Sequence, residues 1–245
     1  MATRASEQAI APQARVTPIK AAKPSVQVKA AKPCAQDAKA RRYDPAETRA
    51  RVIEAAFMLF ATRGYAATGT ADIAREADVS EGSIFYHFGS KRALLAELGR
   101  VHGGRMIAAM QEGDSLELLH PATVVRRCFA FCETDSAYNA MKGRASDALA
   151  VDECPTQHQP SPEAEPFFLA SREVVQQWVE QHIETFCRVH GIEGVDPAIT
   201  ASMTFALVGD ALHQAKISPV EDYQRICEQC ARLVAIGCGA DYSRL

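Results

Sequence analysis

The sequence predicts an all-α protein, and three observations lead to this prediction. Apolar side chains recur at helical spacing, as in Ile53, Ala56, Phe57 and Phe60. Capping residues, prolines and glycines stand where helices would begin and end. The chain has 245 residues, of which 47% are hydrophobic, and this is enough to bury a sizeable core.

Charge divides the chain into a basic start, a near-neutral part and an acidic remainder. Residues 1–43 carry nine Lys/Arg and two Asp/Glu, residues 44–100 carry seven and eight, and residues 101–245 carry eleven and twenty. Because segment 1–43 is rich in Ala, Lys and Pro and lacks apolar periodicity, it is predicted to be a disordered basic tail. Such a tail is either simply solvated or an arm attracted to phosphates.

Two helices are predicted to open the ordered part of the chain. The first begins with Asp44 as N-cap and Pro45 at the first helical position, and Gly64 ends it. The second is short, takes Thr68 as its N-cap, and must end by Asp78.

The stretch VSEGSIFYHFGSKRALL starts a third helix almost directly after the second. Ser80 is a suitable N-cap, so two short helices follow one another across a tight turn, which is the geometry of a helix-turn-helix. Gly82 and Ser83 carry little side chain and would let this helix approach the floor of a DNA major groove. Tyr86 and His87 would present a hydroxyl and an imidazole at the height of the phosphates.

With these features, the segment from Arg51 to Leu95 resembles the tetracycline-repressor (TetR) family of bacterial transcriptional regulators. It has the apolar first helix, the Gly-Tyr joint, the "DIA" helix and the pattern VS-x-G-x-x-Y/F-x-H/Y-F-x-S-K-x-x-L. The resemblance implies a three-helix DNA-binding domain at residues 44–90 and a helical ligand-binding and dimerisation domain at residues 91–245. By position, it also implies DNA contacts from Thr68, Thr70, Gly82, Ser83, Tyr86, His87 and Lys91.

Within this set, the resemblance places Gly82, Ser83 and Tyr86 near bases or the adjacent backbone, and the other four near phosphates. Two nearby residues depart from the family pattern. Asp78 stands where glycine is usual in the turn, and Asp tolerates the left-handed region better than most residues. Glu81 stands where a basic or small residue is common, and it is not among the predicted contacts. A carboxylate is repelled by phosphates unless it accepts a hydrogen bond from a cytosine amine.

Beyond this region the sequence predicts further helices, each begun or bounded by proline or glycine. They cover residues 91 to about 111, 123 to about 150 with a possible break, 166–189, 197–217 and 219–236. The polar stretch VDECPTQHQPSPEAEP is predicted to be a surface loop, or alternatively a lid over a pocket. By position in the family, the last two helices would form the interface of a two-fold homodimer.

An inducer pocket is expected among residues on apolar helix faces that have a polar or aromatic group. The candidates are Phe129, Met141, Trp178, Met203, Asp210 and His213. Asp210 and His213 lie three residues apart in an otherwise apolar helix, so they need partners if they are buried. Those partners could be each other, the second subunit or a ligand.

The cysteines allow a different interpretation. Cys227 and Cys230 form a C-x-x-C, and Cys128 and Cys132 are one helical turn apart, so metal or oxidant sensing is conceivable. Each pair also belongs to an apolar stripe, and packing as small core residues explains both pairs more simply. We therefore predict no metal site and no cofactor.

The resemblance implies a ligand-responsive regulator, most simply a repressor that an inducer releases from an inverted-repeat operator. The alternatives are a redox-sensing or metal-sensing regulator, a protein that coats DNA through its basic tail, and a Cys/His enzyme. The sequence contains no nucleophile elbow, Gly-rich phosphate loop or zinc-protease signature, so an enzyme is not expected. Short apolar runs and cysteines without disulfide spacing favour a cytoplasmic protein with no membrane partner.

Overall fold

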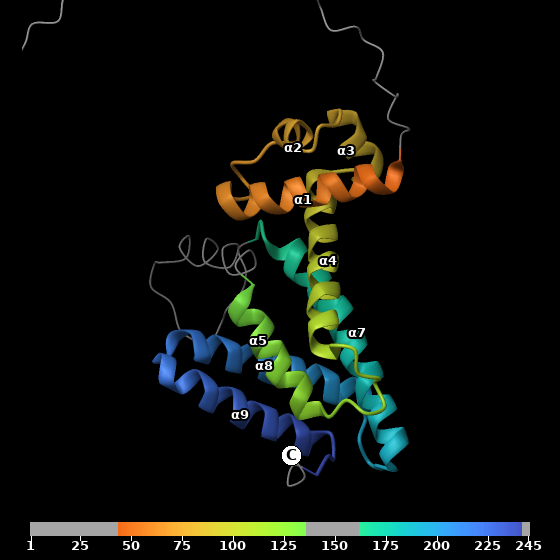
Figure 1. Cartoon of the computed structure of the whole chain (residues 1–245), viewed down its shortest axis with the longest axis vertical. Helices are drawn as coiled ribbons and strands as arrows, with labels where there is room; N and C mark the ends of the chain where they lie inside the picture. The colour runs from red at the N-terminus through yellow and green to blue at the C-terminus, as the bar shows by residue number, and fades with distance from the viewer. Residues whose placement is uncertain (1–43, 136–161, 242–245) are drawn as a thin grey trace, which may run out of the picture. The chain divides into compact units, whose positions relative to one another are not determined.

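Figure 1 shows the computed structural model of the chain, which describes residues 44–135 and 162–241. These residues form eight α-helices and no β-strand, which confirms the predicted all-α fold. The helices are α1 (Pro45–Arg63), α2 (Thr70–Glu76), α3 (Glu81–Phe88), α4 (Lys91–Gln111), α5 (Pro121–Thr134), α7 (Glu165–His190), α8 (Pro197–Ile217) and α9 (Val220–Gly237). The predicted basic tail and most of the predicted polar loop lie outside the described residues. None of the described helices combines the length and apolar character needed to cross a bilayer.

Helix α1 is bounded by the residues that the sequence indicated. Asp44 Oδ1 accepts hydrogen bonds from the backbone N–H groups of Ala46 at 2.9 Å and Glu47 at 3.3 Å, and Pro45 occupies the first turn. Gly64 ends the helix with a φ of 88°, which residues with a side chain rarely adopt. Local sequence therefore fixes both ends of the first helix.

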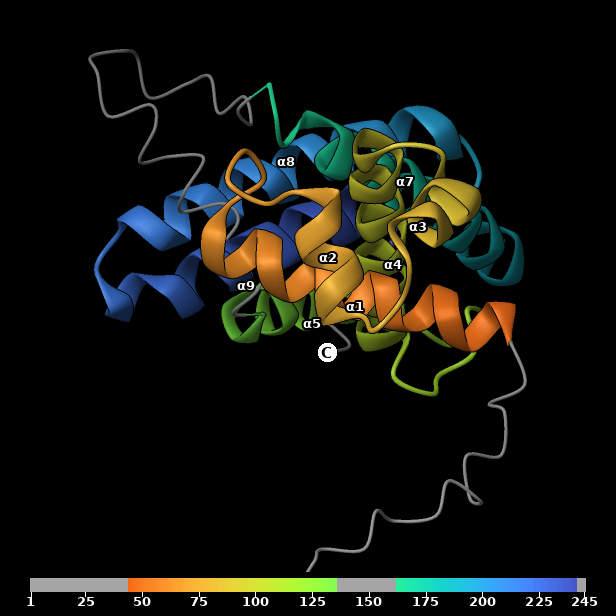
Figure 2. The ribbon, with the colours of Figure 1, turned by 90° about the horizontal axis from the view of Figure 1, so that it is seen from above.

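Helices α1, α2 and α3 and the start of α4 enclose a first apolar core. In Figure 2, α2 and α3 lie on the same side of α1. Phe167, from the beginning of α7, is 1% exposed and belongs to this same core. The first core is thus completed by a residue far along the chain. The side chains in it with no exposed surface are Val52, Ala56, Ile73, Ile84, Leu94 and Leu98.

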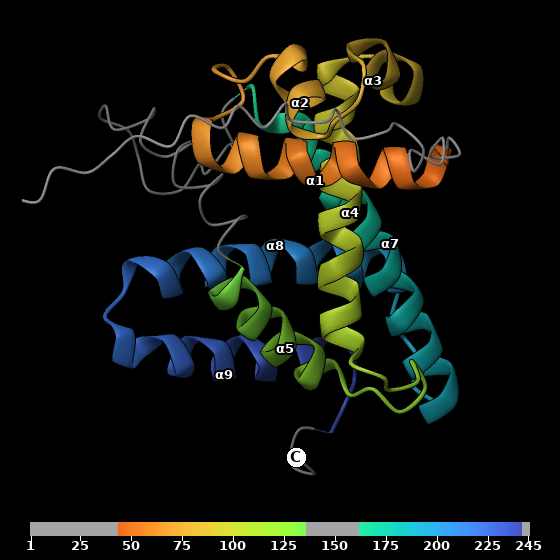
Figure 3. The same ribbon diagram turned by 45° about the horizontal axis from the view of Figure 1, so that its top comes forward.

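Helices α4 and α7 pack against each other at very short range (Figure 3). A Cβ atom placed on Gly99 would lie 2.1 Å from the backbone oxygen of Phe167, and one placed on Gly103 would lie 3.0 Å from that of Ser171. Only a hydrogen atom fits in place of a side chain at Gly99, so Gly99 and Gly103 set the spacing between α4 and α7.

Two buried histidines lie on α4 and α7. His102 Nε2 is 3.1 Å from Asp135 Oδ2, and its Nδ1 is 3.2 Å from Ser171 Oγ. His182 Nε2 is 2.8 Å from the backbone oxygen of Leu119. Burial lowers the pKa of both imidazoles, although the Asp135 carboxylate opposes this effect at His102. The folded protein therefore favours the neutral form of both residues.

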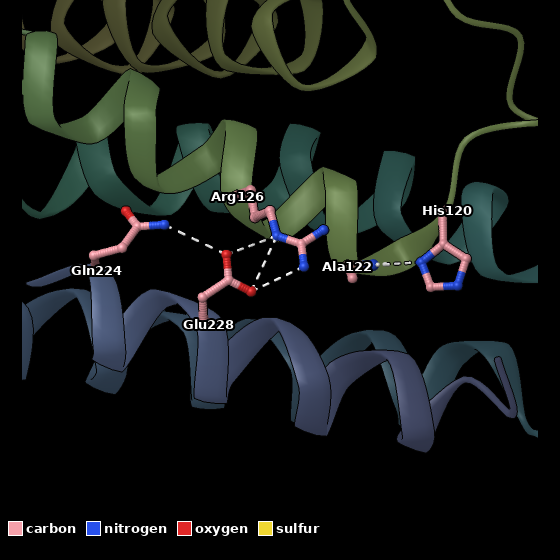
Figure 4. A network of polar contacts seen from close by, with 5 residues as sticks. All are labelled: His120, Ala122, Arg126, Gln224 and Glu228. Atoms are coloured by element: carbon pink, nitrogen blue, oxygen red, sulfur yellow. Dashed lines mark hydrogen bonds and ion pairs between the residues drawn. The ribbon is translucent and has the colours of Figure 1, made fainter. Parts of the chain in front are cut away.

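A second apolar core lies between α5, α7, α8 and α9. At its edge, Arg126 of α5 donates to the Glu228 carboxylate of α9, from Nε to Oε1 at 2.9 Å and to Oε2 at 3.2 Å, and from Nη2 to Oε2 at 2.8 Å (Figure 4). Gln224 Nε2 donates to the same carboxylate at 3.4 Å. His120 Nδ1 accepts from the Ala122 backbone N–H at 3.2 Å and caps α5. These contacts fix the start of α5 and fasten α5 to α9.

Candidate nucleic-acid interface

The connection between α2 and α3 is a tight turn built from local contacts. Asp78 has a φ of 52°, so it adopts the left-handed conformation expected of it in place of glycine. Arg51 of α1 donates to the Asp78 backbone oxygen at 3.3 Å. Ser80 Oγ accepts from the Ser83 backbone N–H at 3.2 Å and caps α3, while Ile84 is fully buried beneath it. The predicted helix-turn-helix geometry is confirmed.

One side of α3 is exposed, and we call its residues Glu81, Gly82, Phe85 and Tyr86 the α3 outer face. Tyr86 is 79% exposed and Phe85 48% exposed. A Cβ atom added to Gly82 would come no closer than 3.8 Å to its nearest neighbour, Ser80 Oγ. Nothing in the described part of the chain therefore requires a glycine at position 82. Its absent side chain leaves room for an approaching molecule.

The other predicted DNA contacts on α3, Ser83 and His87, are less exposed to solvent. Ser83 is half-buried, and its hydroxyl oxygen lies 2.8 Å from that of Ser80. His87 is also half-buried, and the Tyr86 ring lies edge-on to its imidazole at 5.1 Å between ring centres. Both side chains border the α3 outer face.

Phe85 was not among the predicted DNA contacts. It occupies the Y/F position of the recognition pattern, and it lies three residues after Gly82 on the exposed side of the helix. That spacing was visible in the sequence and could have identified it.

The assignment of Thr68 is wrong, both as N-cap and as phosphate contact. Its side chain has no exposed surface, and Oγ1 donates to the Gly64 backbone oxygen at 2.8 Å. Gly69 is the N-cap of α2, and its backbone N–H donates to Asp72 Oδ2 at 3.1 Å. Because its hydroxyl is turned into the protein, Thr68 stabilises the connection after α1 instead of reaching outward.

Thr70, at the first position of α2, directs its hydroxyl to the Glu81 carboxylate of α3. This hydrogen bond joins the first turns of the two helices and orients Glu81. A carboxylate has about four lone-pair positions, so Glu81 can accept from a further donor while it is held by Thr70.

Lys91, at the first position of α4, is half-buried. Its Nζ donates to the Tyr65 backbone oxygen at 2.6 Å and lies 4.0 Å from the centre of the Tyr65 ring. Burial lowers the pKa of the ammonium group. Lys91 thus holds α4 to the connection between α1 and α2, and a phosphate contact would need one of its other N–H donors.

Within the described residues, the side chains predicted to contact an inducer differ in their surroundings. Phe129 is 1% exposed, and the Tyr223 hydroxyl donates to its backbone oxygen at 2.9 Å. Trp178 of α7 is half-buried and stacks on His182, with 5.5 Å between ring centres. Met141 lies outside the described residues.

The three candidates on α8 are placed differently. Met203 is 68% exposed, Asp210 is exposed and His213 is half-buried. The described helices leave the side chains of Met203 and Asp210 exposed, so the assignment of these two residues as inducer contacts stays a prediction. An apolar helix pattern does not distinguish a face covered by the same chain from one open to another molecule.

Helices α8 and α9 also expose apolar side chains, which we call the α8/α9 apolar face: Ile199, Met203, Leu207, Leu233 and Ile236, each between 37% and 68% exposed. An open groove between the two helices is lined by apolar side chains of both, among them Leu207, Ala211, Ile226 and Leu233.

The four cysteines that suggested a sensor, Cys128, Cys132, Cys227 and Cys230, are buried as free thiols in the second core. Burial raises the pKa of Cys227 to about 11 and that of Cys230 to about 12. Since the thiolate is the form that reacts and binds metals, these environments favour inert core residues. Within the two described stretches, no three His, Cys, Asp or Glu side chains are grouped so that they could hold a metal ion.

The tight turn after α2 and the α3 outer face define a helix-turn-helix protein. Residues 52–98 match the family model of the bacterial regulatory proteins of the tetR family. Over these residues, the chain resembles the TetR family of transcriptional regulators.

Known proteins resemble the chain in sequence over part of its length. The HTH-type transcriptional regulator TtgR of Pseudomonas putida is 48% identical over 72 residues, covering 28% of this chain and 34% of that protein. The probable regulator ArpR, also of Pseudomonas putida, is 43% identical over 77 residues, covering 30% and 36%. The chain thus matches about a third of the length of these relatives. A TetR-family transcriptional regulator from Rhodococcus sp. has a solved structure with a TM-score of 0.57 and 20% identity, covering 78% of this chain and 99% of that one, so the fold is shared well beyond the first domain.

Proposed function

We propose that the protein is a transcriptional regulator that binds an inverted-repeat operator as a two-fold homodimer and is released by a small-molecule inducer. The observation that carries the proposal is the α3 outer face, on a helix whose opposite side is fixed to the core by Ile84. A rigid helix with a small residue and exposed aromatic rings on its outer side suits insertion into a major groove.

DNA contacts would be divided between the outer face of α3 and its surroundings. Gly82 would allow close approach, and the Tyr86 hydroxyl would reach a phosphate or base edge. Ser83 and His87 would contribute from the borders of the face. Thr70 and Lys91 are already engaged within the protein, so their main contribution would be to hold the contacting elements in place.

Dimerisation would use the α8/α9 apolar face. Ile199, Met203 and Leu207 are spaced four residues apart along α8 and are exposed in the single chain. Exposed apolar side chains gathered on two neighbouring helices favour association, and a two-fold axis would bring the same face of both copies together. Met203 would then be an interface residue.

Release by an inducer would act through α4 and α7. Phe167 at the start of α7 lies in the first core, while Ile183 and Phe186 of the same helix lie in the second. A ligand that shifts α7 would also shift α4, because Gly99 and Gly103 leave no free space between the two helices. The separation of the two α3 helices in a dimer would change as a result.

A redox or metal sensor is not proposed, because the raised pKa values of the buried thiols work against the thiolate that such chemistry needs. An enzymatic activity is not proposed either, since the family consists of transcriptional regulators.

The test is selection of duplexes from a random library by the full-length protein, followed by gel shifts with the enriched sequence. We expect an enriched inverted repeat, bound by the wild type and at least about tenfold more weakly by Tyr86→Ala. Leu118→Ala, at an exposed apolar position between α4 and α5, is the matched control and should bind as the wild type does. Failure to enrich any sequence would contradict the proposal, and so would equal binding by Tyr86→Ala.

A further inference from the structure

Glu81 and Phe85 lie one helical turn apart on the α3 outer face, and neither was among the predicted DNA contacts. Both are exposed, whereas Ile84 between them is fully buried. Their spacing of four residues places them on one side of the helix, separated by about 6 Å along its axis. That distance corresponds to about two base pairs at roughly 3.4 Å each.

The Glu81 carboxylate is oriented before any DNA arrives. The Thr70 hydroxyl donates to it from the first turn of α2, so its position is fixed by a second helix. A carboxylate facing phosphates would be repelled. In the major groove, however, a carboxylate can accept a hydrogen bond from the N4 amine of cytosine. An oriented acceptor at the start of α3 therefore suits a base edge better than the DNA backbone.

Phe85 has an apolar side chain that is 48% exposed and ends in no polar atom. In the major groove, the apolar group that a phenyl ring can contact is the 5-methyl group of thymine. Contact with the phenyl ring removes the thymine methyl group from water. This burial contributes to affinity and distinguishes thymine from cytosine at that position.

We propose that Glu81 and Phe85 are a base-reading pair: the Glu81 carboxylate accepts a hydrogen bond from a cytosine amine, and the Phe85 ring contacts a thymine methyl group within about two base pairs of it. The pair determines which operator is bound. It rests on the proposed function, because it requires α3 to enter a major groove.

The methyl contact is tested with the duplex that the wild-type protein selects from a random library. Each thymine in turn is replaced by deoxyuridine, which lacks only the methyl group, and binding is measured by gel shift. We expect one position in each half-site where this change weakens wild-type binding by roughly three- to fivefold. Phe85→Ala should bind the unmodified duplex more weakly and lose this sensitivity, whereas the control Leu118→Ala should keep it.

The cytosine contact is tested by replacing each base pair of the same duplex. We expect Glu81→Gln to lose roughly tenfold discrimination at one cytosine per half-site, and to bind other sequences as tightly as the wild type or more tightly because a negative charge has been removed. Glu173→Gln, which removes a charge from an exposed position on α7, is the control and should leave the preference unchanged.

The two contacts can fail separately from each other and from the proposed function. If the wild type tolerates deoxyuridine everywhere, or if Phe85→Ala keeps the same sensitivity, Phe85 does not read thymine. If Glu81→Gln keeps the cytosine preference, Glu81 does not read cytosine. Each of these results leaves sequence-specific DNA binding intact, whereas failure to select any duplex would contradict the proposed function itself.

Discussion

Replacing Gly82 by alanine should change stability and DNA binding in opposite directions. The added Cβ meets only Ser80 Oγ at 3.8 Å, an ordinary contact, so the folded chain accommodates it. Alanine is favoured over glycine within a helix by about 0.5–1 kcal/mol, so the free energy of unfolding should rise by up to that amount. For a domain of this size, the Tm should rise by about 1–4 °C.

The same methyl group would project from the α3 outer face into the space that an approaching base pair needs. Overpacking a close interface costs about 1–3 kcal/mol, which corresponds to roughly fivefold to 150-fold weaker operator binding. Thermal unfolding and gel shifts with the selected duplex measure the two effects. Gly104→Ala is the matched control: this glycine is exposed on α4 with no atom within 4 Å of an added Cβ, so the variant should be stabilised and bind DNA normally. Wild-type affinity in Gly82→Ala would refute the close approach of α3 to DNA.

Three further results are expected. Gly99→Ala should lower the free energy of unfolding, measured by urea denaturation, by about 1–3 kcal/mol or more, because the alanine Cβ would lie 2.1 Å from the Phe167 backbone oxygen. Wild-type stability of this variant would mean that α4 and α7 can separate at no cost. Burial lowers the pKa values of His102 and His182, so below a pH of about 6.5 the unfolded chain binds more protons than the folded chain. The free energy of unfolding should therefore fall as the pH is lowered from about 7.5 to about 5.5, and a flat profile would contradict the burial of neutral imidazoles. In a Cys34→Ser/Cys154→Ser variant, which keeps the six buried cysteines, a thiol reagent at a pH of about 8 should label the native protein slowly and the unfolded protein fully; rapid native labelling would contradict their burial.

The parts of the fold that the sequence predicted correctly are those decided by neighbouring residues. Asp44 and Ser80 cap their helices through hydrogen bonds to backbone groups two or three residues away. Asp78 adopts the left-handed conformation in the turn, which an aspartate tolerates better than most residues. Such interactions involve only adjacent side chains and can be recognised from their order along the chain.

The errors arose where distant parts of the chain decide the outcome. Thr68 and Gly69 are both suitable caps for α2, and burial of the Thr68 side chain beneath α1 leaves the cap to Gly69. The close approach of Gly99 to Phe167 joins segments 68 residues apart in sequence, and no local pattern indicates it. Met203 lies on an apolar face that the described helices leave exposed, and periodicity alone does not show what covers such a face.

The central claim is that one dimer places two α3 helices in successive major grooves on one side of DNA. It is tested most directly by inserting about five base pairs, half a helical turn, between the half-sites of the selected duplex. We expect binding by the wild-type protein to be lost or strongly weakened, and to be partly restored when a full turn of about ten base pairs is inserted. Undiminished affinity for the half-turn duplex would contradict a two-fold dimer with fixed α3 helices.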